Sequence, residues 1–181
     1  MHPNGYNMIS AGLDCTVKLW DLRSFRGTDQ SSSSSLSNSM AKPVAHHTTS
    51  KSINSAFFSP SGKTIVSTTM ANSLDLYNDF HTANGRVASP TRKIRHDNNT
   101  GRWLSTFMAQ WHPHQDLFVV GSMRKPRCIE VFDGKGQELA ALQGDSLTAV
   151  ASRCCFHPSS QYLTIVGGNS SGRVTVCKGT P

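Results

Sequence analysis

Short runs in which apolar and polar residues alternate occupy most of the chain, and turns rich in Gly, Pro, Asn, Asp and Ser separate them. A two-residue period places successive side chains on opposite faces of a β-strand. Comparable runs occur at residues 17–21, 74–78, 129–133 and 174–177. No segment of useful length shows the 3.6-residue period of an amphipathic helix. The pattern predicts an all-β protein.

Each run follows a turn that contains His-Pro or Ser-Pro and then a strand rich in β-branched residues. The four turn prolines are Pro3, Pro60, Pro113 and Pro158, at intervals of roughly 45 to 57 residues. Because Pro cannot donate to a sheet ladder, it marks the turn that leaves a first strand. The interval is close to the about 40–45 residues of one WD40 blade, lengthened by inserted loops. We therefore expect a partial WD40 β-propeller, with about three to four blades of a seven-bladed ring.

The first blade carries the full WD40 signature over residues 10–21. In WD40 repeats the turn Asp and the strand Trp belong to a hydrogen-bond set that locks the blade. Asp14 and Trp20 occupy these positions, so Asp14 is expected to be structural. Tyr77 and Phe132 stand at the Trp position of the next two blades, which are expected to lose this lock.

The blade boundaries follow from the repeat. The chain opens at the first turn of a blade and ends after a third strand, so we expect most of the C-terminal half of a propeller. The expected units are the end of a blade (1–23), a disordered Ser-rich insert (24–41), a blade with an inserted loop (42–95), a blade with basic loops (96–142), and a last blade without its closing strand (143–181).

Composition adds a basic charge balance. The chain has 18 Lys and Arg against 11 Asp and Glu, a formal net charge of +7. This excess suits a polyanionic partner such as nucleic acid, and a generic basic surface is the alternative. The five cysteines form no Cys-x-x-Cys pair, so reduced thiols are expected. Without a membrane-length apolar run or a signal-peptide pattern at its start, the chain is expected to be intracellular.

Catalytic motifs do not emerge from the sequence. It contains no G-x-S-x-G, no phosphate-binding loop and no metal-ligand spacing. The His-Pro pairs recur because the repeat recurs, which favours a structural role for them. We therefore expect a binding scaffold and not an enzyme, with no catalytic residue, cofactor, metal or small-molecule substrate.

Several segments carry a more specific resemblance. Residues 101–113, 120–123 and 167–174 resemble the WD repeat-containing protein 76 family, which is related to the damage-recognising WD40 subunit of the UV-damaged-DNA-binding complex. The similarity covers nearly the whole chain apart from the Ser-rich insert. It implies a nuclear protein that binds DNA, including damaged or base-modified DNA, and chromatin in the DNA damage response. It also implies recruitment to a cullin-4 ubiquitin ligase.

The segment 9–23 fits the WDxR box with which substrate receptors bind the damage-binding adaptor of cullin-4 ligases. Trp20, Asp21 and Arg23 are the adaptor-binding candidates. Arg23 follows the strand and offers a planar guanidinium for charge-assisted bonds to a partner. The alternative is that Trp20 and Asp21 serve packing alone and that Arg23 is a solvated loop residue.

The DNA-binding candidates lie around one blade. A basic zone consists of Arg92, Lys93, Arg95, Arg102, Arg124, Lys125 and Arg127. Of these, Arg124, Lys125 and Arg127 occupy a loop tip, where they would neutralise phosphates. A solvated charged rim is the alternative.

The segment Arg102-Trp103-Leu104 precedes a strand expected at residues 106–111. In the damage-recognising relative, the matching hairpin pushes side chains into the DNA. Here Gly101 and Arg102 replace an aromatic residue and an amide, so Trp103 is expected to stack on an exposed base. Packing of Trp103 between blades is the alternative. A protein-only scaffold that binds peptides is the competing function for the whole chain.

Overall fold

The computed structural model describes residues 1–28, 42–78, 89–101, 103–159 and 163–179. Over these residues the backbone forms four antiparallel sheets and one short 3₁₀ helix, η1 (Leu22–Thr28). The expected fold class, a partial WD40 propeller, is confirmed. No helix among the described residues has the length and apolarity needed to cross a membrane.

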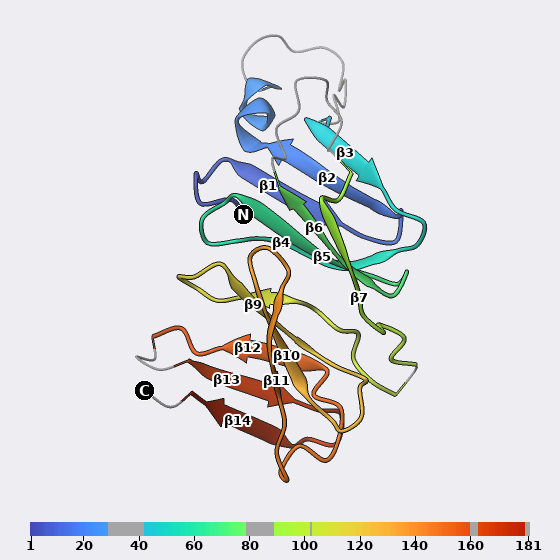
Figure 1. Cartoon of the computed structure of the whole chain (residues 1–181). Helices are drawn as coiled ribbons and strands as arrows, with labels where there is room; N and C mark the ends of the chain where they lie inside the picture. Colours follow the sequence, from blue (N-terminus) through green and yellow to red (C-terminus); the bar gives the residue numbers. More distant parts are fainter. Residues whose placement is uncertain (29–41, 79–88, 102, 160–162, 180–181) are drawn as a thin grey trace.

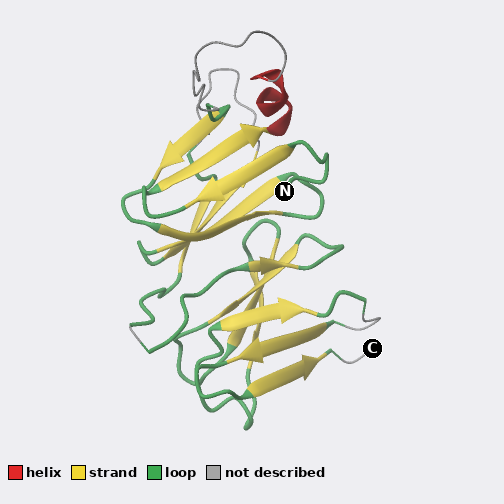
Figure 2. Cartoon of the chain, turned by 180° about the vertical axis from the view of Figure 1, so that it is seen from behind, coloured by secondary structure: helices red, strands yellow, loops and turns green. Residues whose placement is uncertain are grey.

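Within each sheet, strands that are consecutive in the sequence are neighbours. The first sheet contains β1 (Asn7–Ala11), β2 (Thr16–Asp21) and β3 (Ala45–Thr48). The second contains β4 (Ile53–Phe58), β5 (Thr64–Thr69), β6 (Ser73–Asn78) and β7 (Arg92–Arg95). The third contains β8 (Gln110–Trp111), β9 (Leu117–Gly121), β10 (Ile129–Asp133) and β11 (Glu138–Leu142). The fourth contains β12 (Arg153–Phe156), β13 (Thr164–Gly168) and β14 (Val174–Lys178). Figures 1 and 2 show the sheets following one another in chain order.

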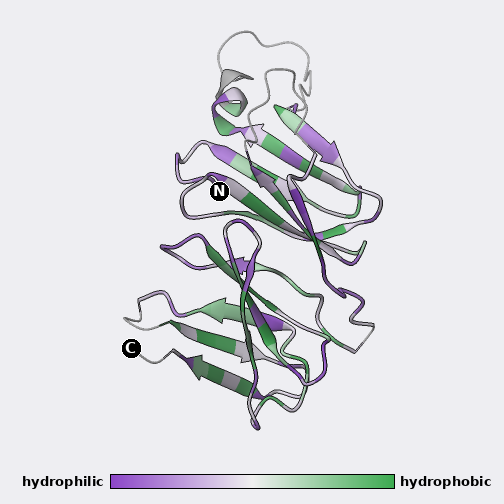
Figure 3. Ribbon diagram, viewed as in Figure 1, coloured by the Kyte–Doolittle hydropathy of each residue, from purple (hydrophilic) through white to green (hydrophobic). Residues whose placement is uncertain are grey.

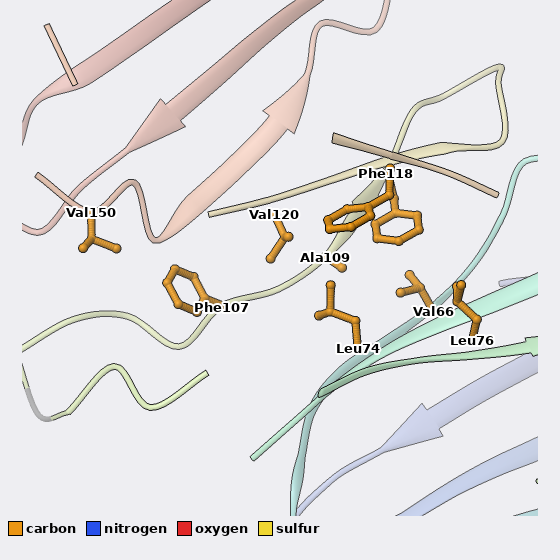
Figure 4. Close-up of a cluster of buried hydrophobic side chains, with 9 residues drawn as sticks. Val66, Leu74, Leu76, Phe107, Ala109, Phe118, Val120 and Val150 are labelled. Atoms are coloured by element: carbon orange, nitrogen blue, oxygen red, sulfur yellow. The ribbon is translucent and has the colours of Figure 1, made fainter. Parts of the chain in front are cut away.

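Apolar side chains fill the space between successive sheets. Between the second and third sheets, Val66, Leu74 and Leu76 meet Phe118, Val120 and Phe132, and each of these side chains is at most 2% exposed (Figure 4). Smaller clusters fill the two flanking interfaces. The alternation of green and purple along the strands in Figure 3 reflects this division into buried and solvent-facing positions. The hydrophobic effect thus joins each blade to the next.

The strand β8 is shorter than the sequence predicts. It spans only two residues, although the alternating pattern predicts a strand over 106–111. Phe107 and Ala109 are fully buried in the cluster between the second and third sheets. The Ala109 N–H donates to the Thr68 hydroxyl of β5 at 3.0 Å. This segment therefore links two sheets instead of extending the ladder of its own.

The side-chain contacts made at the Trp position of the WD40 signature differ among the blades. Trp20 Nε1 donates to Ser10 Oγ at 2.8 Å, as the signature predicts. Tyr77 is also fully buried, and burial raises its pKa to about 12, partly offset by hydrogen bonding with Ser67. The second blade thus places a buried aromatic side chain at the position that Trp20 occupies in the first. In the third blade Phe132 stacks on Phe118, with ring centroids 5.0 Å apart.

The Pro-containing turns lie together at one end of the strands, here named the Pro-turn end. The His2 ring packs against Phe58 at 5.0 Å, and the Ser61 hydroxyl donates to Asp116 at 2.6 Å, so successive turns touch. His2, His112 and His157 each accept a backbone N–H of their own turn through Nδ1. The His-Pro histidines therefore have a structural role. The β7–β8 and β9–β10 connections lie at the other end of the strands, here named the loop end.

Candidate nucleic-acid interface and docking surface

The β7–β8 connection presents Trp103 to solvent. The Trp103 side chain is 88% exposed, so the alternative that it packs between blades is wrong for this structure. The neighbouring Leu104, which was predicted to contact DNA, instead packs against the core between the second and third sheets. Leu104 thereby anchors the connection beneath Trp103. The third residue of the predicted segment, Arg102, lies outside the described residues.

The basic tip of the β9–β10 connection is partly neutralised within the protein. Arg124 Nη1 contacts Glu130 Oε1 at 3.2 Å and Glu138 Oε1 at 2.9 Å, and these bonds raise the Arg124 pKa. Arg127 Nη1 donates to the Met123 carbonyl at 2.9 Å. Lys125 is exposed and has no hydrogen bond or ion pair with any residue that the structure describes. The three predicted phosphate contacts are therefore not equivalent.

A small polar cavity of about 220 Å³ separates this tip from the end of β7. Its floor contains Glu130 and His96, both 4% exposed. Glu130 accepts a hydrogen bond from Ser122 Oγ at 2.7 Å, and its second oxygen lies 3.7 Å from His96 Nε2. Arg95 and Arg124 flank the opening. The only sequence signal for this cluster was the acidic Glu130 inside the apolar run of β10.

Both loops meet at the loop end. Leu104 from the β7–β8 connection and Met123 from the β9–β10 connection pack against the same apolar cluster. The structure thus brings Trp103, Arg124 and Lys125 to one end of the third sheet, as the sequence predicts. Arg127 points its guanidinium back to the loop backbone.

The segment Trp20–Arg23 forms a compact surface feature at the Pro-turn end. Arg23 donates to both Asp21 oxygens, with the shortest contact 2.6 Å from Nη2 to Oδ2, and this pairing lowers the Asp21 pKa. The Arg23 guanidinium also lies 4.0 Å from the centre of the Tyr6 ring. Its side chain remains 65% exposed. The Arg23 guanidinium is therefore restrained by Asp21 and Tyr6 but remains accessible to a partner.

The DNA-binding and adaptor-binding candidates lie at opposite ends of the strands. Asp21 pairs with Asn7 at the Pro-turn end of the first sheet. Gly121, immediately before the basic loop, pairs with Ile129 at the loop end of the third. A ligand at either surface leaves the other accessible.

Comparison with known proteins identifies the repeat. Residues 1–21 match the family model described as "WD domain, G-beta repeat". The four sheets continue the same repeat through the described chain. The described chain therefore has the fold of a partial WD40 propeller, and its first blade is a WD40 repeat. Relatives of the chain include DNA damage-binding protein CMR1 of Chaetomium globosum, 32% identical over 96% of the chain.

Two further relatives are both named WD repeat-containing protein 76. The mouse protein is 42% identical over 70% of this WD40 chain, and the Xenopus laevis protein is 42% identical over 75%. The chain spans 33% of the length of the Chaetomium relative, 20% of the mouse one and 23% of the Xenopus one. The resemblance to the WD repeat-containing protein 76 family is confirmed.

Proposed function

We propose that this chain is part of a nuclear WD40 protein that binds DNA and chromatin in the DNA damage response. Relatives carry the name DNA damage-binding protein. The observation that carries the proposal is Trp103, which is 88% exposed at the same end of the third sheet as Arg124 and Lys125. An exposed indole offers a flat apolar face on which a nucleic-acid base can stack.

The two kinds of side chain have complementary tasks. Trp103 stacks on the π-face of a base. Every base has such a face, so this contact does not depend on the DNA sequence. Lys125 binds a phosphate and releases counterions, which gives affinity without sequence preference. Binding of the complete protein to duplex and single-stranded DNA over a series of salt concentrations tests this function. Affinity that does not fall with salt would favour the protein-only scaffold.

Replacing Arg124, Lys125 and Arg127 together with Ala is expected to weaken DNA binding for all sequences. The log–log salt slope should flatten by about 0.9, the value of one phosphate contact. One contact is expected because Arg124 and Arg127 have partners inside the protein, whereas Lys125 has none among the described residues. An unchanged slope would remove this loop from the interface.

We also propose that the complete protein is a substrate receptor of a cullin-4 ubiquitin ligase, with Trp20, Asp21 and Arg23 facing the damage-binding adaptor. The support is the held, 65% exposed guanidinium of Arg23. Asp21 and Tyr6 restrict its rotamers, so less entropy is lost when a partner carboxylate or carbonyl binds its remaining N–H groups.

Arg23→Ala in the complete protein is expected to reduce co-purification of the adaptor several-fold while DNA affinity stays unchanged. The separation of the two effects follows from the position of the box at the Pro-turn end. Arg173→Ala, which removes an exposed arginine from the turn before β14, is the matched control. Equal adaptor recovery from both variants would mean that the WDxR box serves packing alone and does not bind the adaptor.

A further inference from the structure

The strand β7 is the outermost strand of the second sheet and carries three cations in four residues, Arg92, Lys93 and Arg95. All three are exposed, and only Ile94 packs against the core. None of the three side chains has a hydrogen bond or ion pair with the part of the chain that the structure describes. This differs from the β9–β10 loop, where Arg124 contacts two carboxylates.

The backbone of β7 is held at both ends. Before the strand, Thr91 donates to the Leu76 carbonyl through N at 2.8 Å and through Oγ1 at 3.1 Å. After it, His96 N donates to the Asn72 carbonyl at 3.1 Å. With Ile94 in the core between the second and third sheets, the strand is a rigid platform. Cations on such a platform lose less entropy on binding than cations on a free loop.

The cations of β7 extend in different directions. An added Cβ at Gly136 would lie 3.2 Å from Cδ of Arg92, so the Arg92 stem runs toward the third sheet. Lys93 lies near His47 of β3, where its charge adds to burial in lowering the His47 pKa. Arg95 lines the cavity at the loop end together with Arg124. The cationic edge is thus continuous with the candidate nucleic-acid interface.

The acidic residues near this edge do not cancel it. Asp75 pairs with Lys93 across the ladder but is 2% exposed, so it offers little to solvent. Asp97 lines the cavity beside Arg95. Three exposed cations therefore face one exposed carboxylate.

We propose that the outer edge of the second sheet is a DNA-backbone contact, in which Arg92, Lys93 and Arg95 bind phosphates. Lys93 and Arg95 lie two residues apart on one face of the strand, so about 6.6 Å separates their positions, which is about twice the 3.4 Å of helix axis per charge of a DNA strand. The inference rests on the proposed DNA binding and adds the surface that holds the duplex beyond the loops. It makes β7 a larger source of salt-dependent affinity than the β9–β10 loop.

The test compares two variants of the complete protein with the same loss of charge. One carries Arg92→Gln, Lys93→Gln and Arg95→Gln. The control carries Lys42→Gln, Lys63→Gln and Lys178→Gln, three exposed lysines at or near the Pro-turn end. Binding to one fluorescent duplex is measured over a series of salt concentrations. The β7 variant should flatten the log–log slope by about 2.7, or 0.9 for each contact, and the control should leave it near the wild-type value.

Thermal melting monitors the fold of each variant, and the single change Lys93→Gln should flatten the slope by about 0.9 with unaltered melting. If wild-type protein binds DNA and the β7 variant has the slope of the control, the inference is overturned and the proposed function stands. If wild-type protein does not bind DNA, the proposed function itself fails.

Discussion

Trp103→Ala is expected to lower the DNA affinity of the complete protein by about 1–3 kcal/mol, which is roughly 5- to 150-fold. The side chain is 88% exposed, so its loss removes a stacking surface without opening a cavity. Stacking releases no counterions, so the log–log salt slope should stay at the wild-type value. The measurement is fluorescence anisotropy with single-stranded and duplex DNA at several salt concentrations.

Trp103→Phe and Val44→Ala are the controls. Phe keeps a smaller aromatic plane and should retain part of the affinity. Val44 is 49% exposed and lies beside β3 at the Pro-turn end, so its truncation should not affect DNA binding. Equal affinities for wild-type protein and Trp103→Ala would mean that the exposed indole serves another partner, and the protein-only scaffold would gain support.

Gly121→Ala is expected to reduce the free energy of unfolding by about 3 kcal/mol, through overpacking of a well-filled interface. A Cβ at Gly121 would overlap the Ala151 carbonyl oxygen and lie 3.0 Å from Cε1 of Phe107. The first of these atoms is backbone beside the fourth sheet, so relief requires a shift of that sheet against β9.

Denaturant unfolding of the complete protein measures the effect, with Gly144→Ala as the matched control. An added Cβ at Gly144 meets no atom within 4 Å, so this change should cost little. Coincident unfolding curves for the two variants would show that the third and fourth sheets are packed less closely than the structure indicates.

The repeat and the fold class were predictable from sequence alone. Alternation with period two depends only on which positions face the core, and the recurring prolines marked the turns. Trp20 and Trp103 were also identifiable, one from the WD40 signature and the other from the resemblance to a hairpin of the damage-recognising relative. These are local properties of the chain.

Tertiary structure decided what the candidate residues contact. Arg124 and Lys125 are adjacent in sequence, yet one meets Glu130 and Glu138 while the other has no partner among the described residues. The pairing depends on the fold of the third sheet, because Glu138 is 14 residues from Arg124.

The same reason explains the other differences between expectation and structure. The alternating pattern extended through residues 106–109, but Thr68, 41 residues earlier in the chain, accepts the Ala109 N–H. Leu104 reaches the core and Trp103 does not, although both are apolar neighbours. Periodicity specifies which face of a strand is buried, whereas the pairing of charges and the exposure of a loop side chain depend on atoms that only the folded chain brings within contact distance.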